Sequence, residues 1–133
     1  MTEIKRSQAE LREFFRSKVK ELIHDFNESD LKEYNNFYVW GNCVEKVLNG
    51  PGYIRDKTTG LQCVGIFKNN FLEGHGVSLY KKKGKPRISV RIGNSSSGEF
   101  HGKIICVRSS GVYDEVWEHH KRISKNPREK DTF

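Results

Sequence analysis

Three pairs of glycines constrain the fold of this chain more than any other feature. The two glycines of each pair are nine residues apart: Gly41 and Gly50, Gly65 and Gly74, and Gly93 and Gly102. Glycine permits a positive φ in tight turns and lets neighbouring backbones approach closely. The spacing therefore predicts three β-hairpin units and the start of a fourth near Gly111, an array that is stable only when the hairpins pack on one another.

Short runs rich in β-branched and aromatic residues surround these glycines and have the composition of β-strands. The clearest runs are residues 38–40, 61–67, 77–80, 88–92 and 103–107. Polar segments at 56–60, 81–85 and 108–111 separate successive units and predict turns. We therefore expect a mainly β or α+β protein with a twisted antiparallel sheet of stacked hairpins.

The segment before the first glycine pair has the period of a helix. Ser7 and Glu10 have the spacing of a capping box. Apolar residues then recur along one helical face: Leu11, Phe14, Phe15, Val19, Leu22, Ile23 and Phe26. This pattern predicts an amphipathic helix from about Gln8 to Phe26, with a further helical turn around 31–34. Its apolar face is expected to pack on the protein's own sheet or, as the alternative, on a second chain in a homodimer.

These patterns divide the chain of 133 residues into three segments of one compact domain. Residues 1–35 form the helical segment, and residues 36–118 form the hairpin repeats. Residues 119–133 are polar and without periodicity, so we expect a frayed or mobile tail there.

The repeated unit resembles the MORN repeat family, in which an aromatic-x-Gly-x-aromatic run, a turn and a Gly-x-Gly run follow one another. Residues 63–76 match best, although Cys63 replaces the first aromatic residue. Ile104 replaces the last glycine of the third unit, and Glu115 stands in the fourth where glycine is usual. A degenerate MORN array and an unrelated twisted sheet both fit these departures. The resemblance implies a platform for protein partners or for placement at a membrane.

The sequence favours a non-enzymatic binding module over an enzyme. No nucleophile stands in a recognisable motif, and no glycine-rich phosphate loop precedes a helix. The Glu-x-His motifs at 73–75 and 99–101 contain an acid–base pair, but they differ in position relative to the glycines of their units. We expect no cofactor and no metal site, and we expect buried free thiols at Cys43, Cys63 and Cys106.

The predicted partner is a protein whose helix or extended peptide lies in a groove of the sheet. Aromatic residues dominate binding hot spots. The candidate anchors are therefore Tyr38, Trp40, Phe67, Tyr80 and Tyr113. For Phe67, a place in the core is the favoured alternative.

Positive charge is concentrated in one stretch of the chain. The formal net charge is +7, and residues 81–109 hold eight Lys and Arg against Glu99 alone. This patch predicts, as an alternative function, binding of nucleic acid or of an anionic membrane surface, while a solvated loop is the other interpretation. The candidate anion-binding residues are Lys81, Lys82, Lys83, Lys85, Arg87 and Arg91.

The expected location is the cytoplasm or the nucleus. No apolar run has the length of a transmembrane helix, and residues 1–6 lack the apolar stretch of a signal peptide. An odd number of widely spaced cysteines also suits a reducing compartment.

Overall fold

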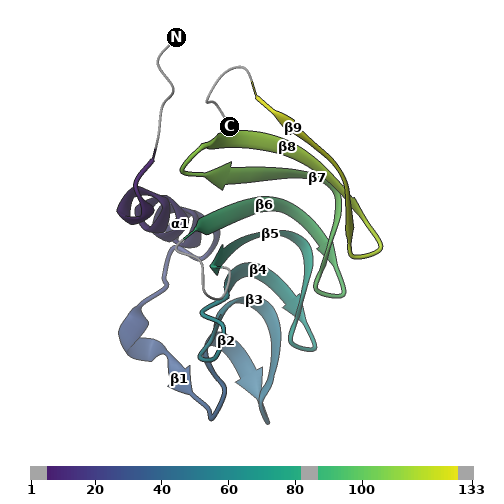
Figure 1. Ribbon diagram of the computed structural model, residues 1–133. Helices are drawn as coiled ribbons and strands as arrows, with labels where there is room; N and C mark the ends of the chain where they lie inside the picture. The colour runs from purple at the N-terminus through teal and green to yellow at the C-terminus, as the bar shows by residue number, and fades with distance from the viewer. Residues whose placement is uncertain (1–5, 82–86, 129–133) are drawn as a thin grey trace.

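In the described part of the chain, one α-helix packs on one antiparallel sheet (Figure 1). The computed structural model describes residues 6–81 and 87–128. Nine strands follow one another across the sheet in chain order, each paired with the next. The elements are α1 Gln8–Leu22, a 3-10 turn Glu28–Asp30, β1 Lys32–Glu33, β2 Phe37–Val44, β3 Val47–Asp56, β4 Gln62–Lys68, β5 Phe71–Lys81, β6 Ile88–Ser96, β7 Glu99–Arg108, β8 Gly111–Glu118 and β9 Lys121–Pro127.

Helix α1 begins where the sequence predicts. The Ser7 hydroxyl accepts a hydrogen bond from the Glu10 amide at 3.1 Å, and the Glu10 carboxylate accepts one from the Ser7 amide at 3.3 Å. This confirms the capping box, whose two bonds satisfy amides that a helix start otherwise leaves unpaired.

The predicted end of the helix at Phe26 is wrong, because α1 ends at Leu22. Ile23 leaves helical geometry with φ −136° and ψ 78°. The bend lets the Phe26 ring pack against the rings of Trp40 and Tyr53, with centroids 5.9 and 5.1 Å away. Contacts with the sheet therefore override the continued helical period of the sequence.

The helical turn expected around 31–34 is also wrong. The turn lies at Glu28–Asp30, where the Asn27 side chain accepts a hydrogen bond from the Ser29 amide at 3.0 Å. Lys32 and Glu33 instead form β1, which pairs with β2. The sheet therefore begins inside residues 1–35, which the sequence predicts as the helical segment.

The apolar face of α1 is buried on the sheet, against β4, β5 and β6 (Figure 1). Its buried residues are Leu11, Phe15 and Val19, with Ile23 just beyond its end. Complete burial of such a side chain contributes about 1.5–3 kcal/mol. The expectation that the helix packs on the protein's own sheet is confirmed.

A row of glycines crosses the sheet from β2 to β6. The residues paired in register are Gly41, Gly52, Gly65, Gly76 and Gly93. Leu48 lies over the first two of these glycines and Leu72 over the next two. A Cβ atom at Gly52 would come within 2.9 Å of the Leu48 side chain, so only glycine leaves room for the leucine.

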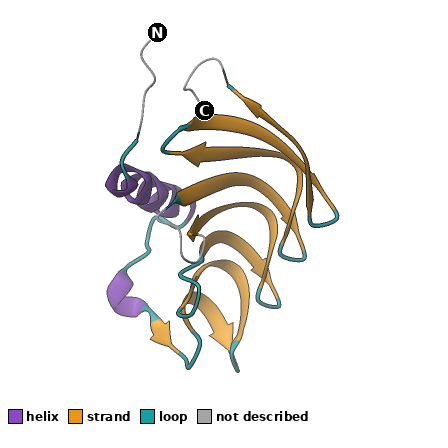
Figure 2. Ribbon diagram, in the orientation of Figure 1, coloured by secondary structure: helices purple, strands orange, loops and turns teal. Residues whose placement is uncertain are grey.

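The first glycine of each pair lies at an irregularity of pairing. The register shifts beside Gly41, Gly65 and Gly93, as it does at a β-bulge. Bulges bend a strand, and Figure 2 shows the strands curving away from α1 towards the hairpin turns.

The second glycines of the pairs share one backbone conformation. Gly50, Gly74 and Gly102 have φ values of 85°, 87° and 78°, and open space surrounds each of them. The pairs spaced nine apart are therefore equivalent in structure as well as in sequence.

The hairpin turns hold one another through equivalent hydrogen bonds. The Asn70 amide donates to the Leu48 carbonyl at 3.0 Å, and the Gly98 amide donates to the Leu72 carbonyl at 2.9 Å. Beside them, the Asn69 amide donates to the Asn49 side chain. The second and third turns are thus each fastened to the hairpin before them, as expected for stacked hairpins.

The C-terminal part of the chain differs from the expected polar tail. Residues 121–127 form β9, which pairs with β8 and completes a fourth hairpin. His119 and His120 make its two-residue turn, both with positive φ. An edge strand is hydrogen-bonded on one side alone and tolerates polar and charged residues, which explains why its composition misled the prediction. Residues 129–133 lie outside the described part of the chain.

Among the residues described, no helix is both long enough and apolar enough to cross a membrane.

The glycine row makes a prediction about stability. A Cβ atom at Gly76 would lie 2.9 Å from the Val64 carbonyl oxygen, which is backbone and cannot turn aside. We expect Gly76→Ala to lower the free energy of unfolding by about 2–3 kcal/mol, measured by urea denaturation. Gly60→Ala is the control, because Gly60 has open space and its φ of 76° alone costs about 1 kcal/mol. Equal losses in the two variants would contradict the close-approach argument.

Candidate functional site

The face of the sheet opposite α1 carries a groove of about 570 Å³ that crosses β3 to β7. We call it the sheet groove. Its large apolar and aromatic lining residues are Ile54, Leu61, Phe67, Phe71, Leu72, Tyr80 and Phe100, and its polar or small ones include Asp56, Cys63, Asn70, Ser78, Ser89, Arg91 and Ser95. Strand pairing places Ile54, Cys63 and Ser78 on one face, as it does Phe67 and Leu72, since partners in register point to the same side of a sheet.

Small polar side chains hollow out the middle of the sheet groove. Ser78, Ser89 and Ser95 are buried in its floor, and the Ser78 hydroxyl lies 3.5 Å from the Cys63 thiol. Large side chains stand on either side of them, so the floor drops between apolar walls. A surface of this shape suits the side chains of a ligand that enter from above.

Two aromatic rings on the wall of the groove remain open to solvent. Phe71 is 56% exposed and Tyr80 is 41% exposed. Phe71 rests on the next hairpin turn, where a Cβ atom at Gly98 would lie 2.8 Å from its ring. The ring is therefore supported from below while its other side faces the groove.

The predicted aromatic anchors do not form one surface. Tyr80 lines the sheet groove, and Phe67 lies buried in its floor, as the core alternative expected. Trp40 packs on Phe26 on the helix side of the sheet. On β2 and β8, the rings of Tyr38 and Tyr113 lie under cations, with the nearest charged group 4.7 and 4.3 Å from the ring centroid.

Sequence reasoning missed Phe71 and Phe100 as groove residues. Each follows a two-residue turn at the start of a strand, in the pairs Phe71-Leu72 and Glu99-Phe100. Strand alternation buries Leu72 and leaves Phe71 outside, and that alternation is the signal that identifies the exposed ring.

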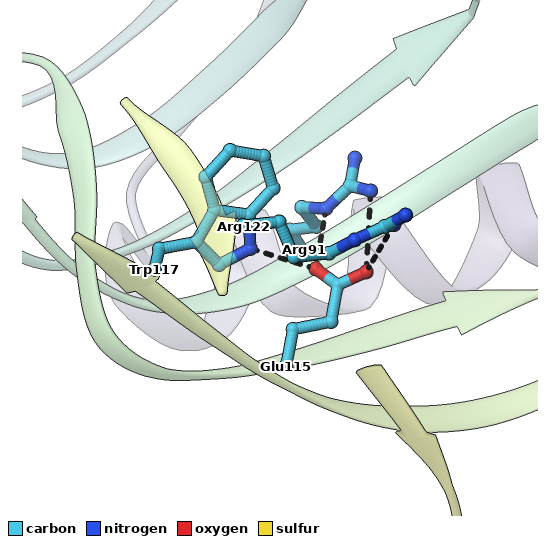
Figure 3. A network of polar contacts seen from close by, with 4 residues as sticks. All are labelled: Arg91, Glu115, Trp117 and Arg122. Carbon is cyan, nitrogen blue, oxygen red and sulfur yellow. Dashed lines mark hydrogen bonds and ion pairs between the residues drawn. The ribbon is translucent and has the colours of Figure 1, made fainter. Parts of the chain in front are cut away.

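Arg91, which lines the groove, belongs to a buried ion pair (Figure 3). The Glu115 side chain is 0% exposed, and one of its oxygens accepts hydrogen bonds from Arg91 Nε and Trp117 Nε1, both at 2.9 Å. Its other oxygen accepts one from Arg122 at 3.2 Å. The network links β6, β8 and β9 across the sheet.

The buried pair stays ionised at neutral pH. Burial alone raises the pKa of Glu115, but the hydrogen bonds from Arg91 and Trp117 outweigh it and hold the pKa below its ordinary value. Burial also works against the charge of Arg91, yet the bond to Glu115 raises the pKa of that guanidinium. Each charge thus depends on its partner, which is the condition for a stable buried pair.

The predicted basic stretch is only partly brought together. Lys81 and Arg87 are exposed at the neighbouring ends of β5 and β6. Arg91 is 12% exposed and is held by Glu115. Lys82, Lys83 and Lys85 lie outside the described residues. Of the six candidates, the structure places two on an exposed surface.

The two Glu-x-His motifs have structural partners. Glu73 accepts a hydrogen bond from the Ser97 amide in the adjacent turn at 2.7 Å, and Glu99 pairs with His120 at 2.5 Å. Among the described residues, no three His, Cys, Asp or Glu side chains are grouped as metal ligands. Burial raises the pKa of the Cys63 and Cys106 thiols, which keeps them protonated at neutral pH.

The sequence matches no protein-family model, and no curated protein matches it. The resemblance of the hairpin units to MORN repeats therefore remains an inference from their glycine spacing.

Removal of Glu115 makes the first prediction for this site. Glu115→Ala leaves the Arg91 guanidinium buried without its carboxylate, and we expect the free energy of unfolding to fall by about 3–5 kcal/mol. The matched control is Asp114→Ala, next in sequence, whose carboxylate is 53% exposed and pairs with Arg128 at 2.7 Å. Loss of an exposed pair costs at most about 1 kcal/mol. Denaturation curves of equal midpoint for the two variants would show that the buried pair is not stabilising.

The lowered pKa of Glu115 predicts how stability changes with pH. A carboxyl whose folded pKa is depressed stabilises the fold above its unfolded pKa, and this contribution is lost as pH falls through the folded value. We expect the wild type to lose more stability than Glu115→Gln between about pH 6 and about pH 3. The other carboxyls are common to both proteins, so parallel curves would contradict the assignment.

Proposed function

We propose that this protein is a non-enzymatic protein-interaction module whose sheet groove binds an amphipathic helix of a partner protein. The observation that carries the proposal is the pair of exposed aromatic rings, Phe71 and Tyr80, on the wall of a groove whose sides are largely apolar and whose hollowed floor contains buried serines. Exposed apolar surface of this kind is characteristic of protein-interaction sites. Aromatic rings that become buried on binding supply a large part of the affinity.

Backbone hydrogen bonding favours a helix over an extended peptide as the occupant. Strands β3 to β7 each pair on both sides, so their backbone groups bond within the sheet and cannot pair with a peptide lying on its face. An extended peptide would find few partners for its own amides and carbonyls beyond the scattered polar side chains of the groove, such as Ser78 and Ser89. A helix satisfies its backbone internally and presents a row of apolar side chains to the groove.

We also propose that the hairpin units are degenerate MORN repeats. The glycine row, the equivalent φ values of the second glycines and the repeated bonds between turns support this proposal. The interaction role implied by that resemblance agrees with the groove.

Binding of phosphate by residues 81–91 has less support among the described residues. Arg91 is committed to Glu115, and of the predicted cations that the structure describes, Lys81 and Arg87 are exposed. The test of the groove also distinguishes this alternative, because a phosphate ligand would not depend on Phe71 or Tyr80.

Photo-crosslinking tests the groove and the form of its occupant. A photoreactive phenylalanine analogue is placed at Phe71 in the full chain, and crosslinked partner peptides from a cell extract are sequenced. We expect peptides with apolar residues at the i, i+3, i+4 and i+7 spacing of a helix. An analogue at Ile123, which is exposed on β9 outside the groove, is the control. Equal crosslinking of the same peptides at both sites, or an alternating apolar pattern, would contradict the proposal.

A pair of double variants measures the contribution of the rings. Phe71→Ser with Tyr80→Ser is expected to weaken binding of the crosslinked peptide at least about tenfold in fluorescence anisotropy. Ile66→Ser with Ile123→Ser removes two other exposed apolar side chains and is expected to leave the affinity unchanged. Equal losses in both double variants would show nonspecific apolar binding.

A further inference from the structure

A second recess lies on the other side of the protein, between α1 and the sheet. We call it the helix-side pocket, and its volume is about 600 Å³. Its floor is formed by Phe15 and Val19 of α1, Tyr53 of β3 and Leu79 of β5. The Tyr53 hydroxyl donates a hydrogen bond to the Gln62 side chain at 2.6 Å, so this polar group in the floor has its partner.

The rim of the helix-side pocket is positively charged on both walls. Arg12, Arg16 and Lys20 follow one another at four-residue spacing along α1, and Arg55 of β3 faces the same recess. Among the described lining residues, Glu28 is the one acidic side chain. Four cations against one carboxylate give the recess a positive potential.

Most basic residues of α1 face the helix-side pocket, and its acidic residues lie elsewhere on the helix. Three of its four basic residues line the pocket, whereas Glu10, Glu13 and Glu21 of this fully described helix do not. Like charges four residues apart repel each other along a helix, and the ion pair of Arg16 with Glu13 at 2.7 Å offsets this repulsion for one of the three cations. An anionic ligand in the pocket would relieve this repulsion.

We propose that the helix-side pocket is a second docking site, which takes an acidic peptide segment of a partner protein. A large apolar side chain of the peptide enters the floor, and neighbouring carboxylates pair with Arg12, Arg16, Lys20 and Arg55. Guanidinium groups bind carboxylates through two parallel hydrogen bonds, which suits a rim that is mostly arginine. The site lies on the face opposite the sheet groove and does not depend on it.

The shape of the pocket selects a peptide over other anionic partners. A bilayer surface is broad and presents its phosphates in a plane, so it cannot reach an apolar floor recessed between a helix and a sheet. A polynucleotide carries phosphates but no aliphatic side chain to bury there. An acidic peptide supplies both the charge and the apolar group.

Fluorescence anisotropy with defined peptides tests the proposal on the full chain. The probe is a fluorescein-labelled peptide of glutamates with Leu and Phe at helical spacing, and its analogues have Gln for Glu or Ser for Leu and Phe. We expect both analogues to bind at least about tenfold more weakly than the probe. We also expect the affinity of the probe to fall as salt is raised, since rim pairs are screened.

Charge reversal with a matched control locates the binding. Arg12→Glu, Arg16→Glu and Lys20→Glu together are expected to weaken the probe at least about tenfold. Lys68→Glu, Lys103→Glu and Lys121→Glu change the net charge equally at exposed positions outside the pocket, with an expected effect below about threefold. If the charge reversal unfolds α1, the measurement is repeated with Gln at positions 12, 16 and 20, which removes the positive charges without adding negative ones. The variant Phe71→Ser with Tyr80→Ser is expected to bind the probe as the wild type does.

Several results would overturn the proposal. Equal loss in the pocket and control reversals would mean that only net charge attracts the probe. Equal affinity for the Ser analogue would mean that the floor is unused. Tighter binding of phosphatidylserine vesicles or duplex DNA than of the probe, abolished by the pocket reversal, would assign the basic rim to a different class of partner.

Discussion

The packing of leucine side chains onto bare glycine backbone is the contact on which the architecture depends. Leu48 and Leu72 each lie over two glycines from neighbouring strands, at distances that leave no space for a Cβ atom. Such close approach brings the side chain within van der Waals reach of the backbone over its whole length. With bulges beside the first glycine of each pair, it also allows the strands to bend. The bend brings successive hairpin turns into contact, and their equivalent hydrogen bonds then repeat along the array.

At the C-terminal end of the sheet, larger residues replace the glycines of the row. Ile104 pairs with Gly93, and its own side chain occupies the space above that glycine. Glu115 takes the next place in the row, and Arg91 reaches it from β6 across β7. The leucine–glycine contact of the earlier units is thus replaced by a buried ion pair. Burial of this charge is stable because both oxygens of the Glu115 carboxylate accept hydrogen bonds. Arg91 of this network also lines the sheet groove, so the irregularity of the last units contributes to the candidate binding surface.

The two faces of the sheet have different roles because there is one helix to cover them. Helix α1 buries the apolar centre of one face and leaves a basic recess along its flank. The opposite face has a smaller apolar cluster of its own, around Leu48, Phe67 and Leu72, and it stays open above it. Exposed rings are costly in water unless a partner covers them, which connects the open face to binding. The two proposed sites therefore lie on opposite faces, where two partners do not compete for space.

The sequence by itself determined the stacked hairpins, the start of the helix and its docking on the sheet. Glycine spacing and helical period are local signals, and the backbone conformations they require are nearly independent of the rest of the chain. It did not determine where α1 ends, since Phe26 is drawn to Trp40 and Tyr53 by contacts across the fold. Nor did it reveal β9, whose polar residues become a strand only because β8 offers an edge with which they can pair.

The candidate site shows the same division between local and tertiary information. The sequence marks Phe67 and Tyr80 as aromatic candidates, but only the pairing of β4 to β7 brings them to one groove with Phe71 and Phe100. Arg91 belongs to a basic run in the sequence, and tertiary structure alone gives it the buried partner Glu115, because the two residues are 24 positions apart and meet only across the sheet.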